Sequence, residues 1–253
     1  MKHRPVTGAR FFFATAPMPC PYLPGRVERR LVTELAGPQV VAFHDQLSQA
    51  GFRRSHSIAY APVCQDCSAC AAVRIVADRF RPSRGQGRVW SRNRDLIVCE
   101  TAPRATEEQF ALFRSYQRSR HGDSDMARMD YYDYQTLVED TAVDTRIFEF
   151  RDRTGALVAG CLTDRLADGF SAVYSFFDPS LSRRSLGTFV ILWLVEHAKA
   201  LGRRHVYLGY WVAGCSKMSY KARYQPLEAY TPEGWRPLRP DDPETARLFR
   251  AGP

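Results

Sequence analysis

Three cysteines follow one another at two-residue spacing, Cys64, Cys67 and Cys70, and Cys20 lies upstream of them. Thiolates at such spacing can hold a metal, and four of them suit tetrahedral zinc or an iron–sulfur cluster. The close triple spacing is more typical of cluster-binding loops than of zinc fingers. A patch of reduced, redox-sensitive thiols is the other interpretation. The pattern therefore predicts metal ligands at these four positions or a thiol surface.

A second candidate for chemistry is the segment 178–189, in which a strand ends, a basic turn follows and Gly187 precedes an apolar helix. Glycine lets the backbone approach a ligand, and the start of a helix favours an anion. Residues 184–189 resemble the acyl-donor loop of the N-acetyltransferase (GNAT) fold at its first two fixed positions, Arg184 and Gly187. Phe189 departs from the third, which weakens a case for coenzyme A. An ordinary strand–helix connection is the alternative.

Two arginine-rich stretches could contact the phosphates of a nucleic acid, with an aromatic side chain available for stacking. The candidate residues are Arg88, Trp90, Arg92 and Arg94 in the first stretch and Arg183, Arg184 and Gly187 in the second. A solvated basic face is the alternative for each. Residues 81–94 contain Pro82, Gly85 and Gly87, so we expect a loop or a loose basic arm there.

The elements that must position these residues differ on the two sides of residues 100–106. Upstream, the pattern predicts a helix over 38–50, short extended pieces near 52–60 and a strand over 74–80. Downstream, a capping box at 106–109 opens a helix, and 121–134 reads as an ordered loop. Strands are then expected over 146–150, 156–165 and 170–177, a helix over 188–201 and a strand over 205–212.

This order predicts an α/β (α+β) chain with two parts. Residues 104–253 are expected to form a GNAT-like acyltransferase domain with a mixed sheet, and residues 1–103 a smaller Cys-rich α+β domain that precedes it.

Composition narrows the class of protein further. The formal net charge is +9 and the pI about 9.4, a balance that attracts polyanions. No apolar run approaches the ~18 residues that a transmembrane helix needs, and the N-terminus lacks a signal-peptide pattern. The odd number of cysteines, seven, also argues against a disulfide framework. We therefore expect a cytoplasmic protein with no membrane partner.

Motifs along the whole chain resemble those of the arginyl-tRNA–protein transferase family. The N-terminal motifs are residues 20–25, 51–55, 60–67 and 92–95, and the C-terminal ones are 173–179, 184–188, 207–211 and 217–221. The likeness runs from about residue 10 to residue 235. The length and the triple cysteine look more like the bacterial members. These are implied to move leucine from leucyl-tRNA to proteins that begin with Asp or Glu, marking them for degradation through the N-degron pathway.

The implied reaction needs positioning, help with one proton and donors for an oxyanion, but no covalent enzyme intermediate and no cofactor for the transfer itself. Asp178, which ends a strand beside the candidate loop, could accept the amine proton, or it could cap its own turn. Tyr174, Tyr210 and Tyr220 are alternative proton relays, although tyrosines at such positions more often belong to the core.

An acceptor that begins with Asp or Glu carries a carboxylate, which a cationic side chain can read. The candidates are Arg53, Arg54, Lys217, Lys221 and Arg223. A solvated surface charge is the alternative for each of them.

Three other functions remain open at this point. An arginyl-tRNA–protein transferase would use arginyl-tRNA as the donor. A coenzyme A-dependent N-acetyltransferase would need no tRNA, but Phe189 and the extra N-terminal domain count against it. A non-catalytic tRNA-binding module would transfer nothing, and the site-like stretch 207–221 counts against it.

Overall fold

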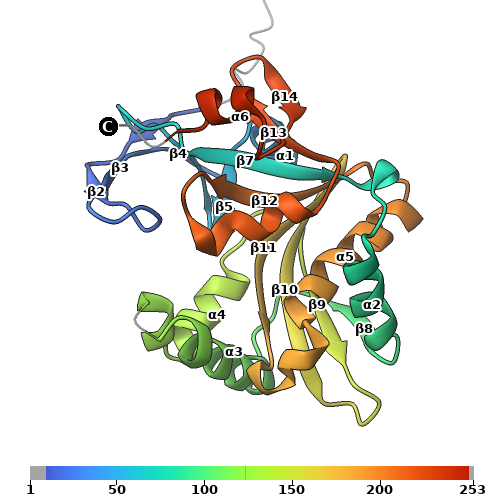
Figure 1. The fold of residues 1–253 in the computed structure, drawn as a ribbon. Coiled ribbons are helices and arrows are strands. Elements are labelled where there is room, and N and C mark those ends of the chain that lie inside the picture. The colour runs from blue at the N-terminus through green and yellow to red at the C-terminus, as the bar shows by residue number, and fades with distance from the viewer. Residues whose placement is uncertain (1–9, 123, 251–253) are drawn as a thin grey trace, which may run out of the picture.

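The computed structural model describes residues 10–122 and 124–250, which form one large sheet, one small sheet and a short hairpin (Figure 1). The large sheet has eight strands in the order β14-β13-β7-β12-β11-β10-β9-β8. The small sheet has the order β1-β4-β6-β5, and β2 pairs with β3.

The strands are β1 (Phe13–Ala14), β2 (Met18–Pro19), β3 (Val27–Glu28), β4 (Arg30–Glu34), β5 (Arg53–Ser55), β6 (Ile58–Pro62), β7 (Cys70–Val76), β8 (Ile97–Thr101), β9 (Thr145–Arg151), β10 (Leu157–Leu166), β11 (Gly169–Phe177), β12 (His205–Val212), β13 (Leu227–Thr231) and β14 (Gly234–Pro237). The α-helices are α1 (Val40–Gln49), α2 (Arg84–Arg92), α3 (Glu107–Arg120), α4 (Tyr131–Glu139), α5 (Leu186–Ala200) and α6 (Pro243–Leu248). Short 3₁₀ helices are η1 (Ala77–Arg79), η2 (Asp125–Arg128), η3 (Pro179–Arg184) and η4 (Ser216–Arg223). None of the helices in the described ranges is long and apolar enough to cross a membrane.

The large sheet is mixed, as predicted. β9, β10 and β11 run antiparallel, whereas β12 lies parallel to β11 and is reached through the crossover helix α5. The expected order of a helix, three antiparallel strands, a helix and a strand is therefore confirmed. The α/β class with a mixed sheet is confirmed with it.

The predicted boundary at residue 103 does not separate the two sheets. β7 lies between β12 and β13, and β8 forms the other edge of the large sheet, although both strands precede residue 103. Strand pairing depends on contacts far apart in sequence, so the change in texture near residues 100–106 could not reveal this sharing.

Two segments expected to be loops are helical. Within 81–94, α2 begins at a capping box in which Ser83 and Gln86 bond each other's backbone N–H groups. The two glycines hid this helix, because glycine disfavours helix formation. Within 121–134, η2 forms and α4 begins, with Asp130 and Asp133 making the same reciprocal cap. The capping box predicted at 106–109 is confirmed at the start of α3.

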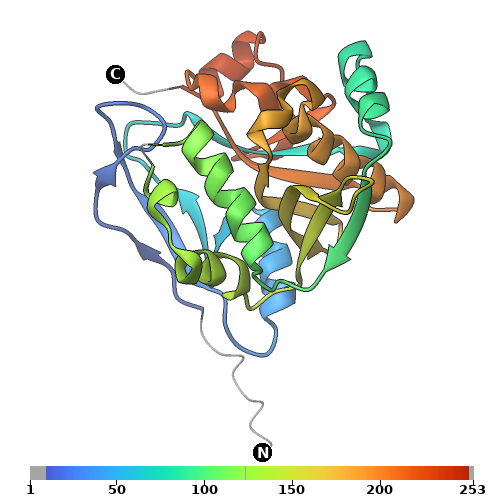
Figure 2. The ribbon, with the colours of Figure 1, turned by 90° about the horizontal axis from the view of Figure 1, so that it is seen from below.

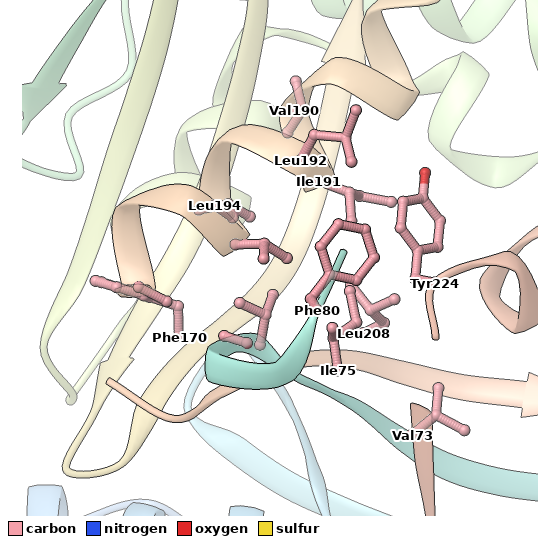
Figure 3. Close-up of a cluster of buried hydrophobic side chains, with 14 of the residues drawn as sticks. Val73, Ile75, Phe80, Phe170, Val190, Ile191, Leu192, Leu194, Leu208 and Tyr224 are labelled. Atoms are coloured by element: carbon pink, nitrogen blue, oxygen red, sulfur yellow. The ribbon is translucent and has the colours of Figure 1, made fainter. Parts of the chain in front are cut away.

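Helices cover both faces of the large sheet. α5 lies in the main core, where Val190 and Leu194 pack near Phe80 and Leu208 (Figure 3), and α2 packs on α5. α3 and α4 cover the other face around Phe113 (Figure 2). Since α5 is apolar nearly all round, it stays buried between the sheet and α2.

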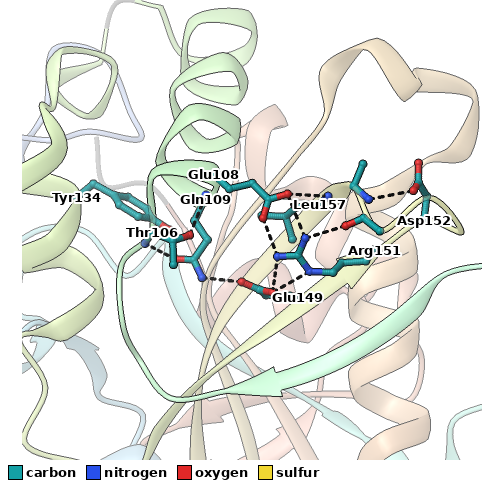
Figure 4. Close-up of polar contacts among 10 residues, drawn as sticks. Thr106, Glu108, Gln109, Tyr134, Glu149, Arg151, Asp152 and Leu157 are labelled. Atoms are coloured by element: carbon teal, nitrogen blue, oxygen red, sulfur yellow. Dashed lines mark hydrogen bonds and ion pairs between the residues drawn. The ribbon is translucent and has the colours of Figure 1, made fainter.

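An ion-pair network fixes the start of α3 on the sheet (Figure 4). Arg151 on β9 binds the Glu108 carboxylate at 2.7 Å and the Glu149 carboxylate at 2.8 Å. Gln109 donates a 2.7 Å hydrogen bond to the buried Glu149. The network orients α3, whose last turns lie near the candidate site.

A buried ion pair joins the small sheet to the large one. The Arg54 guanidinium on β5 holds both oxygens of Asp164 on β10, at 2.7 and 2.8 Å, and Thr145 donates a 2.7 Å hydrogen bond to the same carboxylate. Arg54 and Asp164 are 3% and 0% exposed, respectively. The structure therefore contradicts the expectation that Arg54 reads an acceptor, because its donors are used inside the protein.

Replacing Asp164 with Asn should destabilise the fold by about 3–5 kcal/mol, because it leaves the Arg54 charge buried without compensation. Urea unfolding at pH 7 measures this change in the free energy of unfolding. Asp144→Asn is the matched control, since Asp144 is half-exposed and pairs with Arg146 at the surface, and it should cost less than about 1 kcal/mol. Equal losses in the two variants would contradict a structural role for the Arg54–Asp164 pair.

Candidate active site

The parallel strands β11 and β12 pair over only three residues each and then separate. The paired residues run from Gly169 to Ser171 and from His205 to Tyr207. Immediately beyond them, β11 skips Val173 in its register with β10, and β12 skips Leu208 in its register with β7. Gly209 takes φ +70°, which side chains rarely adopt. Both bulges turn the strands apart and leave backbone groups free between them.

Arg53 fills this opening from the small sheet. Its Nη2 donates a 2.6 Å hydrogen bond to the carbonyl oxygen of Val173. A Cβ atom added to Gly209 would lie 2.0 Å from the Nη1 atom of Arg53, so this position must be glycine for the guanidinium to fit. Among residues 10–122 and 124–250, no carboxylate forms an ion pair with Arg53.

Lys221 lies beside Arg53 and is almost fully buried. Its Nζ donates a 2.5 Å hydrogen bond to the carbonyl oxygen of Tyr210 and lies 5.9 Å from the centroid of the Tyr220 ring. Burial, and then the charge of Arg53, lower the pKa of Lys221 to about 7, against smaller opposing effects of Cys215 and Cys70. Arg53, with the partly protonated Lys221 beside it and no carboxylate of the described residues as a partner, forms a site for an anion. Lys217 and Arg223, the other predicted readers on this segment, have exposed side chains.

The three predicted tyrosines differ in their exposure and in the hydrogen bonds of their hydroxyl groups. Tyr210 is 2% exposed, and its hydroxyl lies within hydrogen-bonding distance of the carbonyl oxygens of Tyr60 and Gly51. Burial raises its pKa well above the usual value, so it serves the structure. Tyr174 accepts a 2.5 Å hydrogen bond from Gln117. Tyr220 is 41% exposed. Proton-relay roles for Tyr174 and Tyr220 stay predictions.

Asp178 caps η3, because its carboxylate accepts a 2.8 Å hydrogen bond from the backbone N–H of Ser180. This is the turn-capping alternative recognised from the sequence. No contact found in the described ranges joins Asp178 to Arg53 or Lys221. Its role as a proton acceptor remains a prediction.

The predicted donor loop and the first basic stretch lie together, and several of their side chains hold one another. Arg184 binds Asp95 and donates a 2.9 Å hydrogen bond to Asn93, while Arg92 donates to the carbonyl oxygen of Arg183. These bonds fasten the end of α2 to the start of α5.

Two further residues predicted to meet tRNA also pack within the protein. A Cβ atom at Gly187 would lie 2.8 Å from the ring of Phe177, so this glycine allows close packing there. Trp90 packs against Phe189, with ring centroids 5.5 Å apart. Arg88, Arg92, Arg94 and Arg183 have exposed side chains. Their contact with tRNA stays a prediction.

The four predicted metal ligands line one cavity of about 300 Å³. Tyr22, Tyr60 and Tyr210, which also surround Arg53, contribute to its wall. Burial, and then the proximity of Cys20, Cys64 and Cys67, raise the pKa of the Cys70 thiol to about 12. Within the described part of the chain, no three potential ligands are close enough to hold a metal ion. The sequence thus brings the cysteines together, and metal binding stays a prediction.

Comparisons with known proteins bear on this arrangement. Residues 18–88 match the family model "Arginine-tRNA-protein transferase, N terminus", and residues 108–231 match "Arginine-tRNA-protein transferase, C terminus". A relative named "Aspartate/glutamate leucyltransferase" from Paramagnetospirillum magneticum is 57% identical over 96% of this chain and 99% of its own. The chain belongs to the arginine-tRNA-protein transferase family.

Two further relatives of the same name extend the comparison. The one from Granulibacter bethesdensis is 51% identical over 98% of this chain and 94% of its own. The one from Rhodospirillum rubrum is 52% identical over 93% of this chain and 96% of its own. Membership of the family makes the chain an aminoacyltransferase that uses aminoacyl-tRNA, so the enzyme class expected from the sequence is confirmed.

Three residues that lie around Arg53 in the candidate site were not among the site residues predicted from the sequence. Tyr22 and Tyr60 flank the guanidinium, and Gly209 leaves room for it. Gly209 carried a usable signal, since a glycine inside a strand pattern often marks a bulge or a close approach. Tyr22 and Tyr60 lie within the motifs 20–25 and 60–67, but those motifs do not show that the two side chains meet at Arg53, because that contact depends on the tertiary fold.

The pKa of Lys221 predicts how stability depends on pH. Between about pH 7 and 10.5 the unfolded chain binds the lysine proton more fully than the folded one, so folding should become more favourable as the pH rises through this range. Lys221→Met removes the titrating group. Urea unfolding should therefore show that wild type gains stability relative to Lys221→Met as the pH rises from 7 to 10. A difference that does not change with pH would contradict a depressed pKa.

Proposed function

We propose that this aminoacyltransferase moves leucine from leucyl-tRNA to the N-terminal Asp or Glu of acceptor proteins. The names of relatives that are 51–57% identical over nearly the whole chain support this choice of donor and acceptor. The family supports tRNA as the carrier. We place the reaction in the cytoplasm, where charged tRNA is available.

The observation that carries the acceptor assignment is the Arg53 guanidinium in the opening between β11 and β12. It is part-buried, has no carboxylate partner among the described residues, and retains N–H donors beyond the one bonded to Val173. The side-chain carboxylate of an acceptor's first residue supplies the missing anion. An acceptor that begins with Asn or Gln would leave the cation uncompensated, so the site favours acidic residues.

The chemistry fits a site without a nucleophile. The ester of aminoacyl-tRNA is already activated, and the acceptor amine, with an unperturbed pKa of about 7.7–8.0, is partly neutral at cellular pH. The two buried cysteines of the C-terminal half, Cys161 and Cys215, are not needed as nucleophiles. Burial raises the pKa of Cys161 to about 12, which disfavours its thiolate.

The purified protein should label a peptide with N-terminal Asp or Glu when it is given tRNA charged with radioactive leucine. Treating the tRNA with ribonuclease should abolish the labelling. Two other donors are tested in parallel: arginyl-tRNA and, without tRNA, acetyl-coenzyme A. Labelling from arginyl-tRNA alone would make the chain an arginyltransferase, and labelling from acetyl-coenzyme A alone would contradict the proposal.

Replacing Arg53 with Ala should raise the KM for an Asp-peptide by roughly 30-fold or more, because a buried charge–charge contact is lost. The KM for an Asn-peptide should change little, so selectivity between the two peptides should collapse. Steady-state kinetics with both peptides measure the effect.

Gly209→Ala should reproduce the loss of selectivity, since its Cβ would displace the Arg53 guanidinium. Gly214→Ala is the matched control. Gly214 also has a positive φ, +77°, but its Cβ would meet nothing closer than Leu23 at 3.9 Å. Retained selectivity in Arg53→Ala would remove Arg53 from acceptor recognition.

A further inference from the structure

The small sheet has one packed face and one face that is open at its outer end, near β1, and partly covered near Tyr60. Thr33, Ala59 and Arg54 are opposite one another in register and are at most 3% exposed. Phe12 lies on the same side, with its ring against Phe43 on α1 and against Phe52. The residues one step along each strand must point the other way, because side chains alternate along a strand.

A single row of residues crosses that open face. Phe13 is opposite Val32, Val32 is opposite Tyr60, and Tyr60 is opposite Arg53. Residues directly opposite in antiparallel strands place their side chains on the same face. The row therefore runs from the edge strand β1 to Arg53, which lies in the opening between β11 and β12.

Exposed aromatic rings mark the outer end of this row. Phe13 and Phe11 are 62% and 65% exposed, and their rings stack with centroids 6.4 Å apart at 27°. Further along, the Arg30 guanidinium lies 4.9 Å over the ring of Tyr60. Stacked rings and a guanidinium plane on an open sheet are surfaces on which unpaired bases stack.

The charged side chains on this face differ between the outer and the inner end of the row. Arg30 is paired with Glu28, and the exposed Glu34 lies at the other end of β4. Arg53 is at the inner end of the row, where its anionic partner in the proposed reaction is the carboxylate of the acceptor. Stacking thus dominates along the row, and Arg53 at its inner end stays available for the acceptor.

The length of the row matches that of a short single-stranded nucleic acid. Three steps between neighbouring strands span roughly 14 Å. This is about the length of four stacked nucleotides at 3.4 Å each. The 3′ end of a tRNA is an unpaired segment of that size, and it carries the aminoacyl ester at its tip.

We propose that the open face of the small sheet, from Phe11 and Phe13 to Tyr60, binds the unpaired 3′ end of the donor tRNA. The inference rests on the proposed use of an aminoacyl-tRNA donor. The bases stack on the exposed rings, and the terminal ester reaches the opening between β11 and β12. The approach through the loop before α5 is less favourable, because Phe177 packs directly over Gly187.

An extended acceptor polypeptide is the competing occupant. Such a chain binds a sheet chiefly through main-chain hydrogen bonds along an edge strand. Here the distinctive groups are rings and a guanidinium plane on a face. β1, the edge strand at the outer end of the row, has only two residues. The face therefore favours nucleic acid, and the experiment separates the two.

The test uses the double variant Phe11→Ser/Phe13→Ser in the full-length protein. Its matched control is Tyr132→Ser, which removes a ring of 75% exposure from α4. Fluorescence anisotropy measures the Kd for uncharged leucine tRNA, either intact or trimmed of its four unpaired 3′ nucleotides. Wild type and control should bind intact tRNA at least about tenfold more tightly than trimmed tRNA, from the stacking of the lost bases. The double variant should bind both forms equally.

Kinetics with leucyl-tRNA and an Asp-peptide complete the test. The double variant should raise the KM for leucyl-tRNA about tenfold and leave the KM for the peptide unchanged, whereas Phe13→Trp should keep the wild-type value because it still stacks. An effect on the peptide KM alone would assign the face to the acceptor, and no effect on either would remove it from binding. If wild type transfers nothing from any charged tRNA, the proposed function itself is overturned. The anisotropy measurement would still show, independently of transfer, whether this face binds the 3′ end of tRNA.

Discussion

The separation of β11 from β12 is the constraint on which the rest of the site depends. Two strands that remained paired would satisfy each other's backbone groups and leave no space between them. The bulges at Val173 and Leu208, together with the positive φ of Gly209, turn the strands apart after three paired residues. Arg53 then occupies the opening. The site thus forms where strand pairing is interrupted within a sheet whose two faces are covered by helices.

Two neighbouring arginines carry out different tasks because side chains alternate along a strand. Arg54 points to the packed side, where Asp164 compensates its charge and locks the small sheet onto β10. Arg53 points to the open side, where no carboxylate of the described residues meets it. The first arginine fixes the position of the second. Loss of the buried pair would therefore loosen Arg53 as well as the fold.

The residues around Arg53 connect the parts of the molecule that the sequence treats as separate. Tyr22 and Tyr60 come from the N-terminal half, and Tyr210 and Lys221 from the C-terminal half. The same tyrosines form a wall of the cavity that the four cysteines line. The cavity of the cysteines and the candidate site therefore share one wall.

By itself the sequence determined the local structure, the mixed α/β class and the family, because capping boxes, strand periods and motifs are local signals. It also singled out Arg53, Lys221 and the four cysteines by type and spacing. It could not reveal that β7 and β8 belong to the large sheet, nor distinguish Arg53 from Arg54. Those outcomes depend on which strands pair and in which register, and a shift of one residue exchanges the two faces of a strand. Tertiary structure therefore decided which cation is buried with a carboxylate and which remains available for a substrate.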